Sequence, residues 1–171
     1  VDALTFDDFD RVIFYGAGMC GYAAAAYSVA SPGATVILVQ PQATLDPRIA
    51  GWDHRFFEYR RLSFTDRYGF APDMTEGAER VFVIYDPDVA LDAMHAALYA
   101  RSWATLLPCR RLGRDVAGAL DAMQIAPAVL KAAGRGDFDA HLFQTFYRAR
   151  RNYQPYLTGL LSRLDREGRL M

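Results

Sequence analysis

Four short apolar segments, each followed by a stretch of helical character, constrain the fold of this chain most strongly. The segments span residues 12–15, 36–40, 81–85 and 104–108. They are nearly continuous in hydrophobicity rather than alternating, which is typical of strands covered on both faces of a parallel sheet. Helices are expected at about 19–30, 53–61, 88–101 and 115–123. Because strands and helices alternate, the sequence predicts an α/β fold, a three-layer parallel sheet of about four strands with flanking helices.

The chain divides into a core and a helical extension. Residues 1–124 are predicted to form the α/β core, and residues 125–171, which show only helical spacing, form a C-terminal extension. Residues 41–79 are too many for a plain connection between two strands. Seven of the 19 residues in 52–70 of this insertion are aromatic. Two interpretations stay open, a small satellite core or a cap over a pocket.

A glycine-rich turn follows the first strand. Gly16, Gly18 and Gly21 stand between the apolar segment and a helix, an order that presents backbone N–H groups to an anion. The spacing is also G-x-G-x-x-G, so a domain that binds NAD or FAD is one alternative. That fingerprint needs an acid at the end of the second strand, where this chain has Gln40.

The same segment carries a resemblance to a known family. The sequence YGAGMCGYAA at 15–24 resembles the Y-G-x-S-M-G-G-Y-A-A nucleophile elbow of α/β-hydrolase-fold esterases. VILVQPQ at 36–42 and VIYDP at 83–87 look like later strands of that fold, the second of which presents the triad acid, here Asp86. LGRDV at 112–116 is similar to the loop that carries the catalytic histidine. The resemblance covers residues 9–120 and implies a cap-like insertion at 41–79.

The chain departs from the family at two catalytic positions. Gly18 replaces the nucleophile and Arg114 replaces the histidine, so only the residual triad acid Asp86 is kept. A guanidinium stays protonated and cannot act as a general base. Without a nucleophile and a base the acyl-transfer mechanism is lost, and the resemblance implies a non-catalytic protein. An active hydrolase is a minor alternative; Cys20 lies in the first helical turn and is expected to point toward packing.

The altered elbow could still bind a small anionic ligand, with no cofactor. Helix amides and a fixed cation favour phosphate, sulfate or carboxylate. The candidate binding residues are Gly16, Gly18, Met19, Gly21, Gln40 and Arg114. Alternatively, Arg114 pairs with Asp86 and fills the site, and the protein is an interaction module.

A sulfonucleotide is a further, minor alternative. Some similar bacterial chains carry the name phosphoadenosine phosphosulfate reductase, and a sulfonucleotide would suit an anion pocket. The S-G-G-x-D-S loop and the C-terminal E-C-G-x-H segment of that enzyme family have no counterpart here, where the last cysteine is Cys109.

The composition limits the kinds of partner that the protein is expected to bind. A net charge of −1, two cysteines and no long apolar run predict a cytoplasmic protein without nucleic-acid, membrane or metal partners. The three histidines have no obvious partner, and His95 is expected on a helix surface.

The strand order can separate the two glycine interpretations. The order 1-2-3-4 favours the hydrolase-like fold, whereas 2-1-3 or 3-2-1-4 favours dinucleotide binding. A sequential order would leave the first strand at an exposed edge, which a homo-oligomer or an upstream segment would complete.

Overall fold

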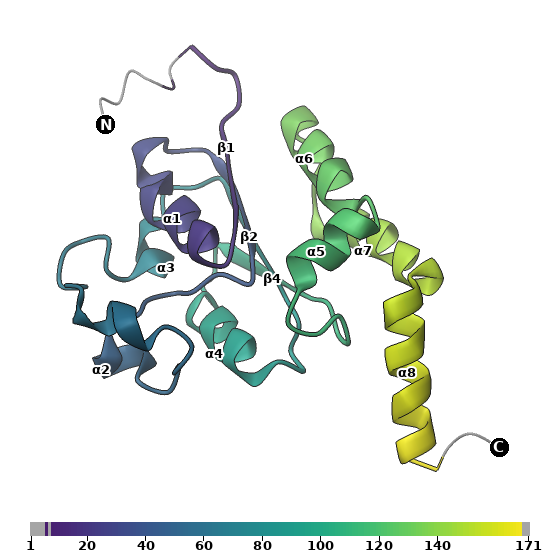
Figure 1. Cartoon of the computed structure of the whole chain (residues 1–171). Helices are drawn as coiled ribbons and strands as arrows, with labels where there is room; N and C mark the ends of the chain where they lie inside the picture. The colour runs from purple at the N-terminus through teal and green to yellow at the C-terminus, as the bar shows by residue number, and fades with distance from the viewer. Residues whose placement is uncertain (1–5, 7, 169–171) are drawn as a thin grey trace.

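The sheet has four parallel strands in sequential order. The computed structural model describes residue 6 and residues 8–168, and its strands are β1 (Ile13–Ala17), β2 (Thr35–Val39), β3 (Arg80–Tyr85) and β4 (Ala104–Pro108). They pair in the order β1-β2-β3-β4 (Figure 1). In register, Gly16 lies opposite Leu38, and Val83 lies opposite Leu106. The predicted parallel α/β sheet is confirmed, with strand ends within two residues of the expected positions.

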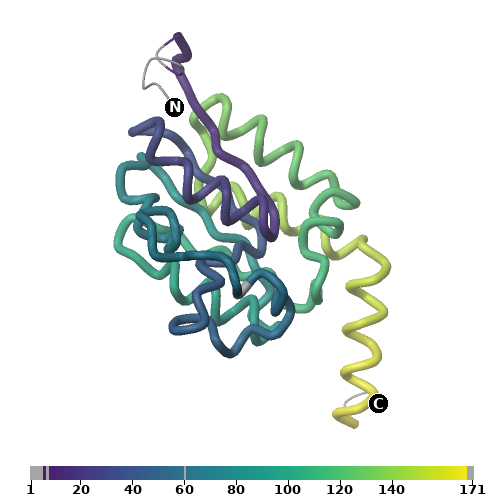
Figure 2. The backbone as a smooth tube through the Cα atoms, turned by 60° about the vertical axis from the view of Figure 1, so that its left-hand side comes forward, coloured from purple at the N-terminus to yellow at the C-terminus, as the bar shows by residue number. Residues whose placement is uncertain are grey.

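Helices cover both faces of the sheet and give it three layers. Val36, Leu38 and Val83 point to a face covered by α1 (Met19–Tyr27), η2 (Ser28–Ala30), α3 (Ala71–Met74) and α4 (Ala90–Leu98). Ile37 and Ile84 point to the other face, where α5 (Val116–Ala122), α6 (Ile125–Arg135) and α7 (Ala140–Tyr147) pack. Since strand side chains alternate, each strand contributes to two separate apolar cores. Figures 1 and 2 show the sheet between these two groups of helices.

The first strand lies at one edge of the sheet. The strand order runs from β1 to β4 without reversing, so β1 is not the central strand that a dinucleotide-binding order requires. The Tyr15 side chain on β1 is 38% exposed. A homo-oligomer or a further strand at this edge stays a prediction.

The insertion is mostly irregular. It contains α2 (Pro47–Ala50), the short 3-10 helix η3 (Phe57–Arg61) and α3. The helix expected at 53–61 is therefore wrong in its first turn. The Asp53 carboxylate accepts a hydrogen bond from the backbone N–H of Arg55, at 2.9 Å. A side chain that binds its own backbone in this way competes with helix formation.

The C-terminal helices behave in two different ways. Helix α6 ends at Gly136, whose φ of 82° places it in the left-handed region that stops a helix. Residues of α6 and α7, among them Val129 and Phe143, are buried against the sheet. After η4 (Arg148–Asn152), α8 (Gln154–Arg166) has no buried residue and stands away from the sheet in both views (Figures 1 and 2). The division at residue 124 stays a prediction.

Among residue 6 and residues 8–168, no helix by itself has the length and apolar character needed to cross a membrane. Helices α5 and α6 reach that threshold only when taken together, and they are bent by 84° at the break between them.

Candidate functional site

The glycine turn between β1 and α1 has the geometry of an elbow. Gly18 has φ 54° and ψ −123°, a conformation that residues other than glycine rarely adopt. Its N–H donates to the carbonyl of Val39 at 2.9 Å, which ties the turn to the end of β2. A Cβ placed on Gly18 would have no atom of another segment within 4 Å. The apex of the turn therefore faces open space.

The other two glycines of the motif are required by packing. A Cβ on Gly16 would overlap the backbone carbonyl of Cys20, and one on Gly21 would lie 3.1 Å from the Cβ of Pro41. Gly16 and Gly21 are thus explained by the close contact of strand and helix, and Gly18 by its positive φ, whatever the turn binds. Together with the sequential strand order, this leaves the NAD or FAD alternative without support beyond its spacing.

A cavity of about 330 Å³ lies beside the start of α1. Its wall on the helix side is formed by Met19, Cys20, Tyr22 and Ala23, and its wall on the insertion side by Gln42, Leu45, Tyr59, Leu62 and Phe64. Nearly all of these side chains are apolar or aromatic. Cys20 is exposed and lines this cavity, so the expectation that it points toward packing is wrong.

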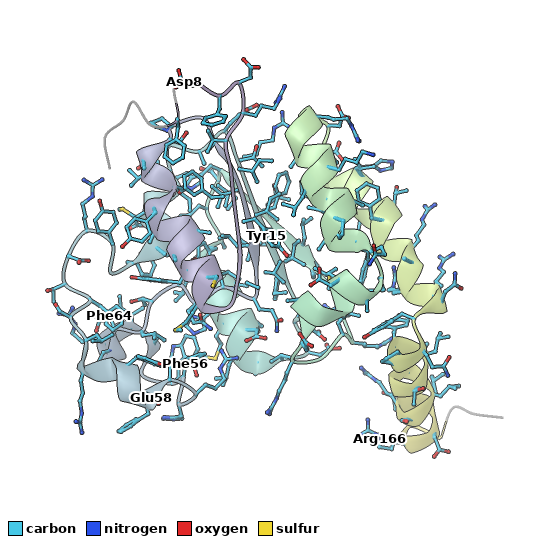
Figure 3. All side chains as sticks on the ribbon, turned by 45° about the horizontal axis from the view of Figure 1, so that its top comes forward. Asp8, Tyr15, Phe56, Glu58, Phe64 and Arg166 are labelled. Atoms are coloured by element: carbon cyan, nitrogen blue, oxygen red, sulfur yellow. The ribbon has the colours of Figure 1, made fainter. Side chains whose placement is uncertain are left out.

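Some aromatic residues of the insertion pack against α1, as a satellite core would, and others line the cavity, as a cap would. The Tyr68 ring packs at a tilt against the Tyr27 ring, with centroids 5.3 Å apart, and the Tyr68 carbonyl accepts a hydrogen bond from the Tyr22 hydroxyl at 2.6 Å. Phe64 instead lines the cavity. Figure 3 shows Phe56 and Phe64, both in the insertion, on the opposite side of the view from Arg166 on α8. The insertion is therefore anchored to α1 and also walls the cavity.

One polar group in this cavity wall has no partner. Gln42 is 4% exposed, and its Oε1 has no hydrogen-bond donor within the described residues. Its backbone carbonyl accepts from the Tyr99 hydroxyl at 3.0 Å, which holds the residue in place. An unpaired buried acceptor costs about 1–3 kcal/mol. Sequence reasoning missed Gln42, because no local signal marks an amide that loses its partner on folding.

Asp86, which the resemblance predicts to be a triad acid, binds backbone N–H groups. It is fully buried at the end of β3. Its Oδ2 accepts from the N–H of Gly113 at 2.7 Å, and its Oδ1 accepts from the N–H of Asp88 at 2.9 Å. Asp86 therefore shapes the loop that follows β4. The alternative in which it pairs with Arg114 is not observed, since Arg114 has no ion pair in the described part of the chain.

Arg114 and Gln40 are brought together, but away from the elbow cavity. The Arg114 side chain lines a separate cavity of about 290 Å³ with Arg55 and Asp88. Gln40 Nε2 donates to the Arg114 carbonyl at 3.0 Å, and Gln40 Oε1 accepts from the Val116 N–H at 2.8 Å. The Gln40 amide thus holds the loop. The prediction that Arg114 places a positive charge at the elbow is therefore not supported by this geometry.

A buried polar network, which the sequence did not reveal, fastens the insertion to α4. His95 is 1% exposed, so its expected surface position is wrong. Its Nδ1 accepts from the Ala43 N–H at 3.1 Å, and its Nε2 therefore donates to Asp53 Oδ2 at 2.9 Å. The Arg55 guanidinium bridges Asp53, at 2.8 Å, and Asp92, at 2.6 Å. Both imidazole nitrogens are in use, so His95 cannot serve as a general base.

The contacts of this network shift the pKa values of Asp53 and His95. Burial alone raises the pKa of Asp53, but hydrogen bonds from Arg55 and His95 outweigh it and lower the pKa to about 2. Burial lowers the pKa of His95, and Asp53 opposes this only in part. At neutral pH the network therefore contains a neutral His95 imidazole, the Arg55 guanidinium and the Asp53 carboxylate.

No group of three or more potential metal ligands is found among the described residues. Comparison with known proteins adds no relative: no family model, no curated protein and no solved structure matches this chain.

Stability should fall as the pH is lowered from 7 to 5. The unfolded state takes up the His95 proton near pH 6.5 and the folded state only at lower pH, so the free energy of unfolding decreases below about pH 6.5. A second loss follows between about pH 4 and pH 2, when Asp53 is protonated, and amounts to about 2 kcal/mol. Urea unfolding across this pH range measures both.

His95→Gln should lower the free energy of unfolding at pH 7 by about 1–3 kcal/mol and flatten the decrease between pH 7 and 5. His141→Gln, at an exposed position, is the matched control and should keep the wild-type profile. A wild-type slope retained in His95→Gln would show that other groups carry the pH dependence.

Gly18→Ser should fold but be less stable by about 1–3 kcal/mol, because the side chain has space and only the backbone conformation is strained. It should not hydrolyse p-nitrophenyl esters above background, since no histidine lines the cavity within the described residues. Gly77→Ser, at an exposed glycine with open space around it, is the control for stability. Ester turnover by Gly18→Ser would mean that a base is available there.

Proposed function

We propose that this chain is a non-catalytic, α/β-hydrolase-like protein that binds a small amphipathic molecule in the elbow cavity, meaning the cavity between α1 and the insertion. The observation that carries the proposal is an apolar cavity beside an open elbow, with a buried amide that has no partner. Ligand sites commonly combine an apolar lining with a few polar groups that fix orientation.

The apolar lining selects the body of the ligand. Leu45, Leu62 and Phe64 on the insertion face Met19 and Ala23 on α1 across the cavity. Its volume of about 330 Å³ is near the lower end of known ligand pockets, which favours a short alkyl chain or a single ring. Leu62, at 61% exposed, and Met19, at 50%, become covered when such a body is bound.

Two polar features select the head group. No side chain caps the first turn of α1, so its N–H groups are available to a carbonyl oxygen. The Gln42 Oε1 needs a donor. A primary carboxamide supplies an acceptor and a donor, and matches both features once the Gln42 side chain, whose Oε1 is closed to solvent in this structure, turns toward the cavity. A carboxylate, one of the anionic head groups that the sequence favours, satisfies the helix end and would leave Oε1 facing a negative charge.

Binding without turnover follows from the groups that the elbow lacks. Gly18 offers no nucleophile, and Asp86 is engaged by backbone N–H groups. His95 is engaged on both ring nitrogens. A resident amide or ester would therefore be held and released unchanged.

Gln42→Leu should separate ligand binding from stability. The free energy of unfolding should rise by about 1 kcal/mol, because an unpaired buried oxygen is removed. The affinity for hexanamide should fall roughly tenfold, because the ligand N–H loses its acceptor. Calorimetric titration with hexanamide, hexanoate and hexanol, together with urea unfolding, measures both effects.

Ala23→Phe is the second variant, since it fills the cavity from the helix side and should abolish binding of all three probes. Ala97→Phe, the same enlargement at an exposed position of α4, is its control. Equal binding of the probes to Ala23→Phe and wild type would place the ligand elsewhere. Binding of hexanoate in preference to hexanamide would contradict the carboxamide and favour the anionic ligand predicted from the sequence.

A further inference from the structure

A third cavity, of about 360 Å³, lies where the chain leaves β4 and where α7 gives way to α8. Three of its lining residues are arginines and none is acidic. The lining consists of Pro108, Arg110, Arg111, Gln144, Tyr147, Arg150 and Tyr156. The whole chain has a net charge of −1, so this concentration of positive charge is local and does not follow from a basic composition.

The backbone around this arginine cavity is firmly held. The hydroxyl of Tyr147, a residue that is 4% exposed, donates to the carbonyl of Arg110 at 3.1 Å. The N–H of Cys109 donates to the carbonyl of Tyr85 at 2.7 Å. Arg111 has a φ of 70°, in the left-handed region that is uncommon for an arginine. Such a conformation persists only where the surrounding contacts impose it, and it is often found at functional sites.

The three guanidinium groups are poorly neutralised. Arg111 has no ion pair within the described residues. Arg110 approaches Asp88 only at 3.4 Å, and its side chain is 68% exposed, so this contact is weak. Arg150 donates to the Tyr147 carbonyl at 2.9 Å and lies 4.3 Å from the centre of the Tyr147 ring. That position is fixed by a ring and a carbonyl, which leave its charge uncompensated.

We infer that the arginine cavity binds a small molecule carrying phosphate groups. Planar guanidinium forks pair with phosphate oxygens through two parallel hydrogen bonds, and arginine is the preferred residue for this contact. Arg110 and Arg111 approach from the loop after β4 and Arg150 from η4, so a phosphate between them is contacted from two elements. This site shares no lining residue with the elbow cavity, and neither proposal depends on the other.

Titration calorimetry with inorganic pyrophosphate tests the inference. Pyrophosphate should bind in a saturable manner and more tightly than inorganic phosphate, and acetate should not compete. Arg111→Gln should weaken pyrophosphate binding roughly tenfold, the loss of one charge-assisted contact. Added salt should weaken binding, because the contacts are electrostatic.

Arg151→Gln is the matched control, since it removes the same charge from an exposed neighbour that does not line the cavity. It should change the affinity less than about twofold. Equal losses in Arg111→Gln and Arg151→Gln, or no saturable binding by the wild type, would overturn the inference. Urea unfolding of each variant shows that the fold is kept.

Discussion

The burial of β2 and β3 on both faces is the constraint on which the rest of this structure depends. Their side chains alternate between two apolar cores, so helices must cover both sides of the sheet. Because all four strands run parallel, every β-to-α turn lies at the same edge of the sheet. The glycine turn, Asp86 and the loop of Arg110 and Arg111 all follow the carboxyl ends of strands, which is why the cavities gather there.

The polar network around Arg55 gives the insertion its place on this scaffold. Buried ion pairs contribute little net stability compared with apolar packing, but removing one partner is costly because it leaves an uncompensated charge. The network therefore fixes where the insertion sits, with His95 and Asp92 on α4 as its fixed half. The same placement turns Leu45, Leu62 and Phe64 toward α1 and forms the wall of the elbow cavity.

The elbow offers a backbone geometry that can hold a ligand but no group that can carry out acyl transfer. Gly18 has a strained conformation and open space in front of it, yet has no side chain. Asp86 is buried and holds a loop through backbone N–H groups. Geometry of this kind remains useful for holding a ligand, because helix amides and an apolar wall act without proton transfer. In the proposed function, the unpaired Gln42 Oε1 lowers the stability of the free protein and helps to bind the ligand.

The sequence alone determined the parallel sheet, its strand positions and most of the helices on its faces, because hydrophobic runs and helical spacing are local properties of the chain. It also showed that Gly18 and Arg114 cannot perform serine-hydrolase chemistry. Only the tertiary structure decided the partners of the polar side chains. His95 meets Asp53 across 42 residues of sequence, and Gln40 meets Val116 across 76. Such pairs leave no local pattern, since burial and the fold choose them, and the same reason hid Gln42 and the arginine cavity.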